Sequence, residues 1–386
     1  MNRLTMNELF SGIGAQKRGI DLTGLFDCEV VATADIEKDA MVSYAAIHNG
    51  LTNEMVKEYS YYPSEEQMRK ELMDKNIGFD FKKGTNPIAR VSGEKLKKYY
   101  LAMIISKNLG DISKIAELPH ADFWTYSFPC QDISIAGKQA GIVQGETRSG
   151  LLYEVERLLT RAKESDTLPK YLLLENVKNL VGKQFKEKFD DWISRLDELG
   201  FNTYWSVVNA KDCGIAQNRE RVFAVSIRKD VDTKQFEFMK PFDLGLRLRD
   251  FLDTDVDEKY YLSQEIQDRL QITDPTFEKS IVEFGYRPPM EELSKTLKAN
   301  ANDAGVVYKK RVRKLTPREC YRLMGFSDEC YDKALSVGLS DSTGYKQAGN
   351  SIVTYCIKGI MEHLYKAQYD STYICFDENF TKPQVE

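Results

Sequence analysis

The sequence predicts an α/β fold, a doubly wound sheet accompanied by a second, smaller lobe. Its length of 386 residues exceeds the usual size of one domain. Short apolar runs alternate with amphipathic stretches along much of the chain, as strands and helices of such a sheet do. Two polar regions, 50–108 and 229–311, interrupt this alternation. We therefore expect one large core that carries an insertion, and a lobe beside it.

The core elements follow one another as strand, turn and helix. A strand over 4–10 leads through the tight turn 11–14 into a helix over 15–25. The next expected strands are 29–34, 122–127, 171–174 and 222–227, and the next expected helices are 38–48, 151–163 and 185–199. Helices are also expected over 64–76 and 93–107 in the insertion, over 316–324 with Pro317 in its first turn, and over 352–365.

These elements set the predicted domain boundaries. A core domain spans 1–228 and carries the insertion at 50–108. The variable lobe spans 229–311, and residues 312–386 form a hinge and return to the core domain.

The composition excludes several classes of protein. Hydrophobic residues make up 42% of the chain and charged residues 29%, and no run approaches the ~18 apolar residues that span a bilayer. The first ten residues lack the order of a signal peptide, so a cytoplasmic, soluble protein is expected. The seven cysteines contain no Cys-x-x-Cys pair, which argues against a disulfide framework and against a metal site. None of the three histidines is near Cys130 in the sequence, which weakly disfavours a cysteine hydrolase.

The net charge of −5 does not suggest a nucleic-acid binder, but one local run does. Seven basic residues lie between Lys309 and Arg322, against the single acid Glu319. From the residues alone, a solvated basic face is the favoured interpretation and a phosphate-binding patch is the alternative.

The turn Phe10-Ser11-Gly12-Ile13-Gly14 joins a strand to a helix, where backbone N–H groups can face a ligand. A plain βα turn is an equally good interpretation, because the third glycine of the dinucleotide motif is missing. Asp35 favours the ligand site, because it ends the second strand, where a carboxylate can bind the two hydroxyls of a ribose. Asp111, after Gly110, can present a carboxylate to an adenine amino group, or can be an exposed residue after a helix end.

Phe128-Pro129-Cys130-Gln131 directly follows a strand, which places Cys130 at the carboxyl end of the sheet, where open α/β folds bind ligands. A buried, inert thiol is the alternative. The following residues contain four glycines, together with Lys138 and Arg148, and so favour a polar loop that closes over a substrate.

Glu175 ends another buried strand and points to the same crevice as Cys130 if the two strands are neighbours. There a carboxylic acid can donate a proton to a base nitrogen, although an exposed residue that caps a turn is the alternative. Arg219 and Arg221 lie on alternate positions before the last strand, from where they can lower a thiol pKa and contact a phosphate or a base carbonyl.

In this order, the motifs resemble those of the DNA cytosine-5 methyltransferase family, of the prokaryotic or phage restriction-modification type. Beyond the glycine turn, Phe-Pro-Cys-Gln, Glu-Asn-Val and Gln-x-Arg-x-Arg, the later family motifs are present as Arg313-x-Leu315-Thr316-Pro317-Arg318-Glu319 and Gly344-Tyr345-Lys346-Gln347-Ala348-Gly349-Asn350-Ser351. The chain differs from the family at Ala15, Asp35 and Ile36, where glycine, glutamate and an aromatic residue are more usual.

The resemblance implies a Rossmann-like methyltransferase that binds double-stranded DNA and transfers a methyl group from S-adenosylmethionine, leaving S-adenosylhomocysteine. The target cytosine would be flipped out, Cys130 would add to carbon 6, and Glu175 would contact ring nitrogen 3, with Arg219 and Arg221 at the base oxygen and a phosphate. The implied cofactor residues are Phe10, Gly12, Ile13, Gly14, Asp35, Ile36, Asp111, Ile112, Pro129, Leu151, Asn350 and Ser351. The implied DNA contacts are Gln131, Lys138, Arg148, Arg311, Arg313 and Arg318.

The resemblance also reverses the interpretation of the basic run, which is now expected to contact DNA. Sequence choice is assigned to 229–311, a contact of the insertion with DNA is a hypothesis, and a monomer is expected. Two alternatives stay open: a methyltransferase of the same fold that acts on transfer RNA, and an inactive relative that binds DNA.

Overall fold

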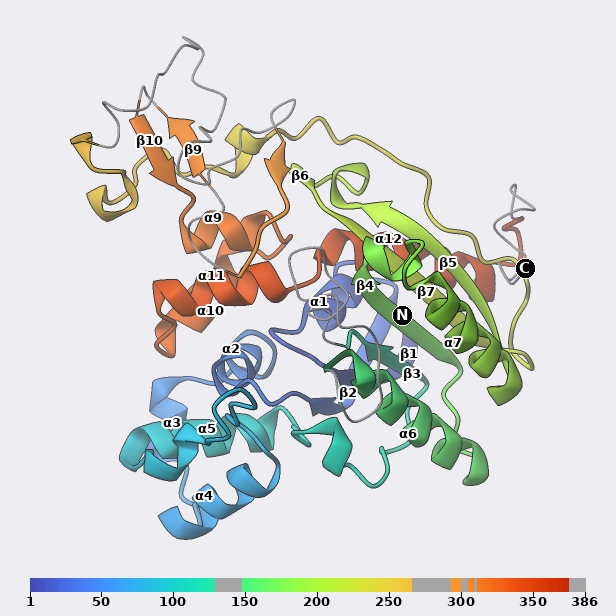
Figure 1. The fold of residues 1–386 in the computed structure, drawn as a ribbon, viewed down its shortest axis with the longest axis horizontal. Helices are drawn as coiled ribbons and strands as arrows, with labels where there is room; N and C mark the ends of the chain where they lie inside the picture. The colour runs from blue at the N-terminus through green and yellow to red at the C-terminus, as the bar shows by residue number, and fades with distance from the viewer. Residues whose placement is uncertain (129–147, 266–292, 300–304, 309–310, 375–386) are drawn as a thin grey trace. The chain divides into compact units, whose positions relative to one another are not determined.

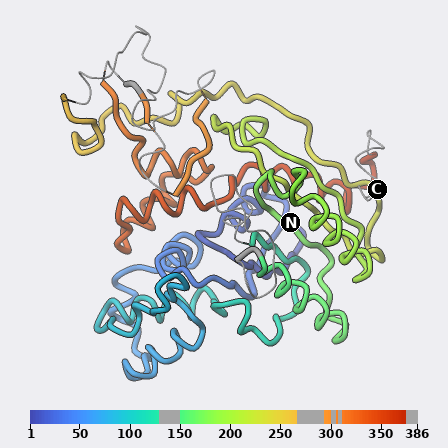
Figure 2. Tube along the Cα trace, viewed as in Figure 1, coloured from blue at the N-terminus to red at the C-terminus, as the bar shows by residue number. Residues whose placement is uncertain are grey.

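The computed structural model describes residues 1–128, 148–265, 293–299, 305–308 and 311–374. The chain divides into two compact units. The first unit contains 1–208, 220–239 and 357–386, and the second contains 209–219 and 240–356. Figure 2 traces the chain by residue number from blue to red.

The first unit is built on a six-stranded sheet, in the order β2-β1-β3-β4-β7-β5 (Figure 1). Its strands are β1 (Asn2–Leu9), β2 (Phe26–Ala34), β3 (Phe123–Tyr126), β4 (Tyr171–Val177), β5 (Phe201–Asn209) and β7 (Glu220–Arg228). β1 pairs in parallel with β2 and β3, β3 pairs in parallel with β4, and β7 is antiparallel to β4. The carboxyl ends of β1 to β4 therefore lie along one edge of the sheet, where ligands bind in open α/β folds.

Helices cover both faces of this sheet. α6 (Leu152–Glu164) and α7 (Lys186–Leu199) bury their apolar sides with Leu172 and Leu174 of β4. Because successive strand residues point to opposite faces, Tyr171 faces the other side, and there it bonds Gln368 of α12 (Thr354–Tyr369). α1 (Ala15–Asp21) and α2 (Lys38–Asn49) lie on that second face too, as their bonds to the buried Glu8 carboxylate show.

The insertion forms a small helical layer within the first unit. It contains α3 (Asn53–Glu58), α4 (Glu65–Asp74), the short helix η1 (Pro87–Arg90) and α5 (Gly93–Ile105). α5 packs on α2, and the fully buried side chains Leu72, Ile77 and Leu96 contribute to the core of the layer. The insertion is thus an integral part of the first unit.

Within the described residues, the second unit contains short elements and the helices α9 to α11 (Figure 1). The short elements are β6 (Gln217–Asn218), η6 (Leu248–Phe251), η7 (Glu258–Tyr260), β8 (Ser294–Lys295), β9 (Gly305–Tyr308) and β10 (Arg311–Lys314). The helices are α9 (Pro317–Arg322), α10 (Asp328–Ser336) and α11 (Asp341–Asn350). Thr316 and Glu319 cap the start of α9 reciprocally, and Pro317 occupies its first turn as expected.

The predicted fold class is confirmed, and each expected strand and helix is present to within a few residues. The edge strand β5 was not expected, because its mixed burial pattern is not that of a core strand. The observed division also differs from the predicted boundaries. Residues 312–356 belong to the second unit, and the first unit resumes only at 357, inside α12.

Candidate active site

The glycine turn after β1 is held in a conformation that other residues adopt with difficulty. Phe10, Gly12 and Gly14 all have positive φ, at 55°, 53° and 79°. A Cβ on Gly14 would lie 2.2 Å from Nε2 of His48, whereas a Cβ on Gly12 would meet no atom within 4 Å. Gly14 is therefore required by packing, and Gly12 leaves open space beside the turn.

Asp35 lies next to this turn at the end of β2. Its Oδ2 accepts a hydrogen bond from the N–H of Gly12 at 2.8 Å, and its Oδ1 accepts one from the N–H of Glu37 at 2.7 Å. These bonds fix the carboxylate at the carboxyl edge of the sheet, the geometry that binding of ribose hydroxyls requires.

Asn108 joins Asp35 to the Gly110–Asp111 turn. Its side chain bonds the N–H and the carbonyl of Asp35 and accepts the N–H of Gly110. Asp111 is buried. Its carboxylate accepts hydrogen bonds from the N–H of Ser113 and from Nδ2 of Asn76. Sequence reasoning assigned no role to Asn108, because its bonds to Asp35 join residues 73 positions apart.

The remaining cofactor candidates of the first unit differ in exposure. Ile13 and Ile112 are buried, and Ile112 belongs to the main apolar core. Ile36 is partly exposed beside Asp35, and Leu151, just before α6, packs against the core. The turns after β1 and β2 and the segment 110–112 thus supply a set of groups that fits a nucleoside.

Glu175 lies beside the start of the Phe-Pro-Cys-Gln segment. The parallel pairing of β3 with β4 confirms that the two strands are neighbours. Nδ2 of Asn176 donates to the carbonyl of Phe128 at 3.0 Å, in a buried bond that ties the end of β4 to the residue before Pro129. The Glu-Asn pair therefore combines a buried acid near the end of β4 with an amide that holds Phe128.

Arg221 forms an ion pair with Glu175, with its Nε 3.2 Å from Oε1. The Glu175 side chain is only 10% exposed, so this pair is largely shielded from water. Arg221 reaches Glu175 because β7 pairs with β4 in antiparallel register.

Arg219 has different surroundings. It is 4% exposed, and its guanidinium donates to the carbonyls of Leu297, Gly349 and Ser351, all within the second unit. Its expected contact with the base or a phosphate stays a prediction, and the bonds observed here hold the second unit together.

Asn350 and Ser351 end α11 in the second unit. Asn350 is exposed and Ser351 is buried. The carbonyl of Ser351 accepts the shortest of the three hydrogen bonds from Arg219, at 2.8 Å.

Four predicted site residues, Pro129, Cys130, Gln131 and Lys138, lie outside the described residues. Arg148 begins the short helix η3 (Arg148–Leu151). Two of the described thiols are unsuited to nucleophilic attack, because burial raises the pKa of Cys28 to about 12 and also raises that of Cys320.

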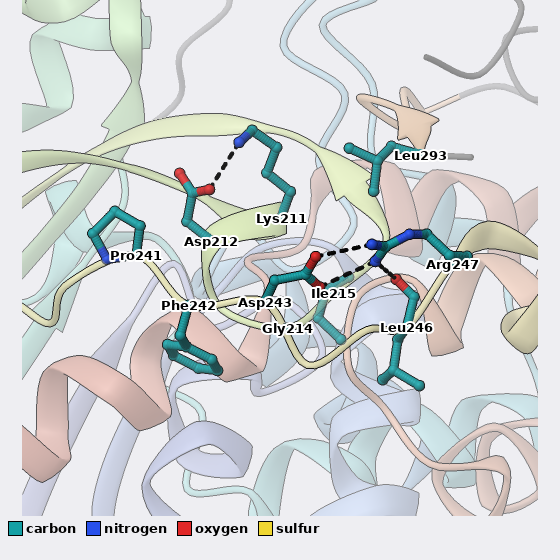
Figure 3. A pocket seen from close by; sticks show the side chains of 10 residues that line it. All are labelled: Lys211, Asp212, Gly214, Ile215, Pro241, Phe242, Asp243, Leu246, Arg247 and Leu293. Atoms are coloured by element: carbon teal, nitrogen blue, oxygen red, sulfur yellow. Dashed lines mark hydrogen bonds and ion pairs between the residues drawn. The ribbon is translucent and has the colours of Figure 1, made fainter. Parts of the chain in front are cut away.

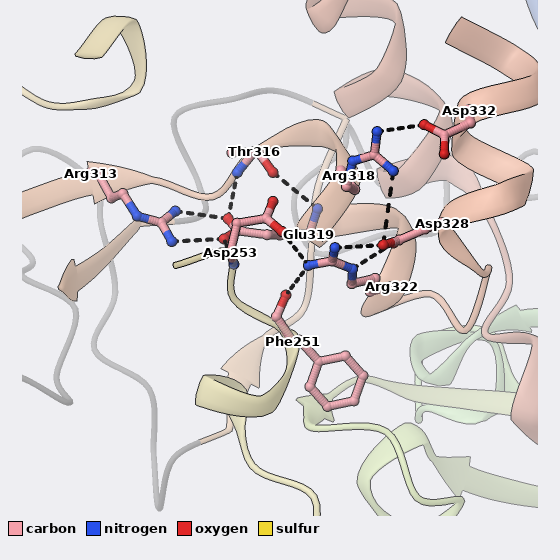
Figure 4. A network of polar contacts seen from close by, with 9 residues as sticks. All are labelled: Phe251, Asp253, Arg313, Thr316, Arg318, Glu319, Arg322, Asp328 and Asp332. Carbon is pink, nitrogen blue, oxygen red and sulfur yellow. Dashed lines mark hydrogen bonds and ion pairs between the residues drawn. The ribbon is translucent and has the colours of Figure 1, made fainter. Parts of the chain in front are cut away.

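The described arginines of the basic run pair with acids of the second unit, and three of them are drawn in Figure 4. Arg311 pairs with Glu258, Arg318 with Asp332, and Arg322 with Asp253 and Asp328. Charge counting along the sequence included only Glu319, so it overestimated the positive surface. DNA contacts of Arg311 and Arg318 stay predictions, and they would have to replace these pairs.

The expected DNA contact of Arg313 needs correction. Its side chain is 0% exposed and forms two hydrogen bonds with the carboxylate of Glu319, at 2.7 and 2.8 Å. The Glu319 carboxylate also accepts the N–H of Thr316, so the pair stabilises the start of α9 (Figure 4). A fully enclosed guanidinium cannot reach a phosphate.

A pocket in the second unit lies between residues 211–215, 241–247 and Leu293 (Figure 3). Asp243 and Arg247 form a bidentate ion pair on its wall. No site residue predicted from the sequence lines it.

Two features are absent from the described ranges. Among the helices there, none has the length and apolar character of a membrane-spanning segment. The same ranges contain no cluster of His, Cys, Asp or Glu side chains arranged to hold a metal ion.

Known proteins resemble this chain over most of its length. A family model described as C-5 cytosine-specific DNA methylase matches residues 74–366. The type II methyltransferase M2.ScrFI of Lactococcus lactis subsp. cremoris is 38% identical over 377 residues, which cover 95% of this chain and 100% of that protein. The orphan methyltransferase M.SssI of Spiroplasma monobiae is 31% identical over 388 residues, covering 94% and 97%. The crystal structure of the S. pombe Dnmt2 methyltransferase has the same fold, with a TM-score of 0.56, 16% identity and coverage of 94% and 99%.

Proposed function

Because the chain belongs to the C-5 cytosine-specific DNA methylase family, we propose that it methylates a flipped-out cytosine of duplex DNA with Cys130, Glu175 and Arg221. The observation that carries the assignment of residues is the Glu175–Arg221 pair near the end of β4, where the next residue, Asn176, bonds the Phe128 carbonyl. The chain segment with Cys130 begins there, at the carboxyl edge of the sheet.

The pair matches the atoms of the base. Ring nitrogen 3 and the oxygen on carbon 2 are adjacent on cytosine, and the Glu175 and Arg221 groups are 3.2 Å apart. Glu175 donates a proton to nitrogen 3 and Arg221 donates a hydrogen bond to the oxygen, so both stabilise the negative charge that moves into the ring during attack.

Cys130 acts as the nucleophile. Its thiolate adds to carbon 6, and the electrons of the carbon 5–carbon 6 double bond make carbon 5 nucleophilic. The bound cofactor supplies an electrophilic methyl group on a sulfonium. Loss of the proton on carbon 5 to a base and expulsion of the Cys130 sulfur then restore the double bond.

S-adenosylmethionine fits the groups at the ends of β1 and β2. Asp35 binds the ribose hydroxyls, Phe10 stacks on the adenine, and the segment 110–112 contacts the adenine edge. The support is the carboxylate fixed by Gly12, the open space at Gly12, and the side chain of Asn108 that joins Asp35 to Gly110. For Asn350 and Ser351, which belong to the second unit, cofactor contacts stay a prediction from the sequence.

The test measures transfer of tritium-labelled methyl groups to duplex DNA and to transfer RNA. We expect label in DNA for the wild type and for Cys28→Ser, and none for Cys130→Ser. Label in transfer RNA alone contradicts the DNA substrate, and full activity of Cys130→Ser contradicts the mechanism.

A second measurement isolates the covalent step. In DNA that has fluorine in place of hydrogen on carbon 5 of cytosine, no proton can be lost from carbon 5. The last step is therefore blocked, and the covalent adduct between Cys130 and the base should accumulate. We expect a denaturant-resistant protein–DNA complex with the wild type and none with Cys130→Ser.

A further inference from the structure

The insertion reaches the proposed adenine site through the end of α4. Residues 74–78, which we call the α4 turn, contain two positive φ angles, 56° at Asn76 and 80° at Gly78. Asparagine and glycine are the residues that adopt this conformation most readily. The α4 turn therefore has a defined backbone path.

This turn bonds both segments that the adenine site needs. The N–H of Gly78 donates to the carbonyl of Ile36 at 2.7 Å. The N–H of Asp111 donates to the carbonyl of Lys75 at 2.9 Å, and Nδ2 of Asn76 donates to Oδ2 of Asp111 at 2.7 Å. Ile36 and Asp111 come from separate parts of the chain, and the insertion holds them together.

The packing here is close. A Cβ on Gly110 would lie 2.3 Å from the carbonyl oxygen of Lys75, so only glycine lets the two segments approach this far. Lys114 adds a bond from its Nζ to the carbonyl of Asp74, at 2.8 Å. Leu72, just before the turn, and Ile77, within it, are fully buried and anchor it in the insertion core.

Asn76 fixes the orientation of the Asp111 carboxylate. Oδ1 of Asp111 accepts two bonds from Ser113, and Oδ2 accepts the bond from Asn76. With one oxygen held on each side, the carboxylate plane cannot rotate about its Cβ–Cγ bond. Preorganisation of this kind raises affinity, because binding then orders fewer groups.

We propose that Asn76 is a positioning residue for the adenine end of the cofactor, and that the insertion is a cofactor-affinity element of this chain. This inference rests on the proposed function, because Asp111 and Ile36 contact adenine only if S-adenosylmethionine binds there.

The test compares Asn76→Asp with Asn76→Gly. Both replacements tolerate the positive φ, so neither adds backbone strain. Asn76→Gly removes the hydrogen bond to Asp111, and Asn76→Asp also places a second carboxylate there. We expect the Kd for S-adenosylhomocysteine, measured by calorimetry, to rise about tenfold for Asn76→Gly and more for Asn76→Asp, the size of a lost bond to a charged group.

The readouts separate positioning from folding. KM for S-adenosylmethionine should rise with the Kd, while kcat and the Kd for DNA without cofactor stay unchanged. Lys70→Gln, on an exposed part of α4, is the matched control and should behave as wild type. Thermal unfolding of each variant without cofactor should match that of wild type.

Two failures are distinguishable. Wild-type protein that binds no S-adenosylhomocysteine contradicts the proposed cofactor site itself. Normal wild-type binding with an unchanged Kd in both Asn76 variants contradicts only the role of Asn76, and a Kd that rises together with a loss of thermal stability shows a purely structural role.

Discussion

At the scale of single residues, the first unit contains a buried acid, Glu8, in the middle of its sheet. Its carboxylate accepts hydrogen bonds from the hydroxyl of Tyr44 and from the N–H of Lys17. Burial raises the pKa of Glu8 from 4.5 to about 7, against the lowering effect of these bonds. The charged form is thus the costly one in the folded protein.

This shift predicts how stability depends on pH. Because the pKa of Glu8 is higher in the folded state, its favourable contribution is present below about pH 4.5 and is lost as the pH rises through about 7. Glu8→Gln has no charge at any pH. Between about pH 4.5 and 8, the free energy of unfolding of the wild type should fall by about 3 kcal/mol relative to Glu8→Gln. Urea unfolding of both proteins measures this, and a difference that does not vary with pH would contradict it.

Residue-level prediction from the sequence succeeded where chemistry follows from position on a strand. Asp35 and Glu175 were expected at strand ends, and both lie there. It failed for Arg313, because a run of charges does not show which acids the fold brings near. The roles of Asn76 and Asn108 depend on contacts across 35 and 73 residues of sequence, which local patterns do not contain.

At the scale of elements, the β1–α1 turn combines two glycines with different functions. Both have positive φ, but only Gly14 packs against side chains of α2, while the space at Gly12 is open. Gly14 is therefore needed for folding, whereas Gly12 leaves room for a ligand beside the turn.

Alanine at the two positions should distinguish them. Gly12→Ala should reduce the free energy of unfolding by about 1 kcal/mol, from backbone strain alone. Gly14→Ala should reduce it by about 3 kcal/mol or more, because a clash with His48 adds to the strain. Gly12→Ala should nevertheless raise KM for the cofactor, because its methyl group enters the proposed site. Chemical unfolding and steady-state kinetics test both statements, and equal destabilisation by the two changes would refute the distinction.

Most elements were predictable because their apolar patterns are local. The strands β3 and β4 are short buried runs, and α6 and α7 show one apolar side each. β5 has partly exposed residues along much of its length, so its identity as a strand depends on pairing with β7.

At the scale of the whole molecule, the second unit extends beyond the predicted variable lobe. The network of Figure 4 explains the difference, since Arg322 in α9 bonds the carbonyl of Phe251 and the carboxylate of Asp253. The predicted boundary at 311 separates residues that the folded unit joins.

This extension predicts the outcome of exchanging segments with a relative such as M.SssI. Replacing 240–356 keeps the network intact, so the hybrid should fold and methylate the donor's recognition sequence. Replacing 229–311 alone removes the carboxylate of Asp253, a partner of Arg322, so that hybrid should unfold at lower temperature. Thermal unfolding and bisulfite sequencing of treated DNA measure both. Equal stability of the hybrids would contradict the role of the network, and retention of the original recognition sequence by the 240–356 hybrid would place sequence choice elsewhere.

The second unit is formed by two separate segments of the chain, 209–219 and 240–356. The gene therefore encodes these two pieces apart from each other. A recombination event that replaces only the longer piece with that of a relative therefore leaves Gln217 and Arg219 of this protein in place. Gln217 bonds the N–H of Leu297 and the carbonyl of Leu323, and Arg219 bonds three further carbonyls. All these partners are main-chain groups, and a segment from a relative also has them, whatever its side chains. Recombination of the longer piece thus requires no matching mutation at either position.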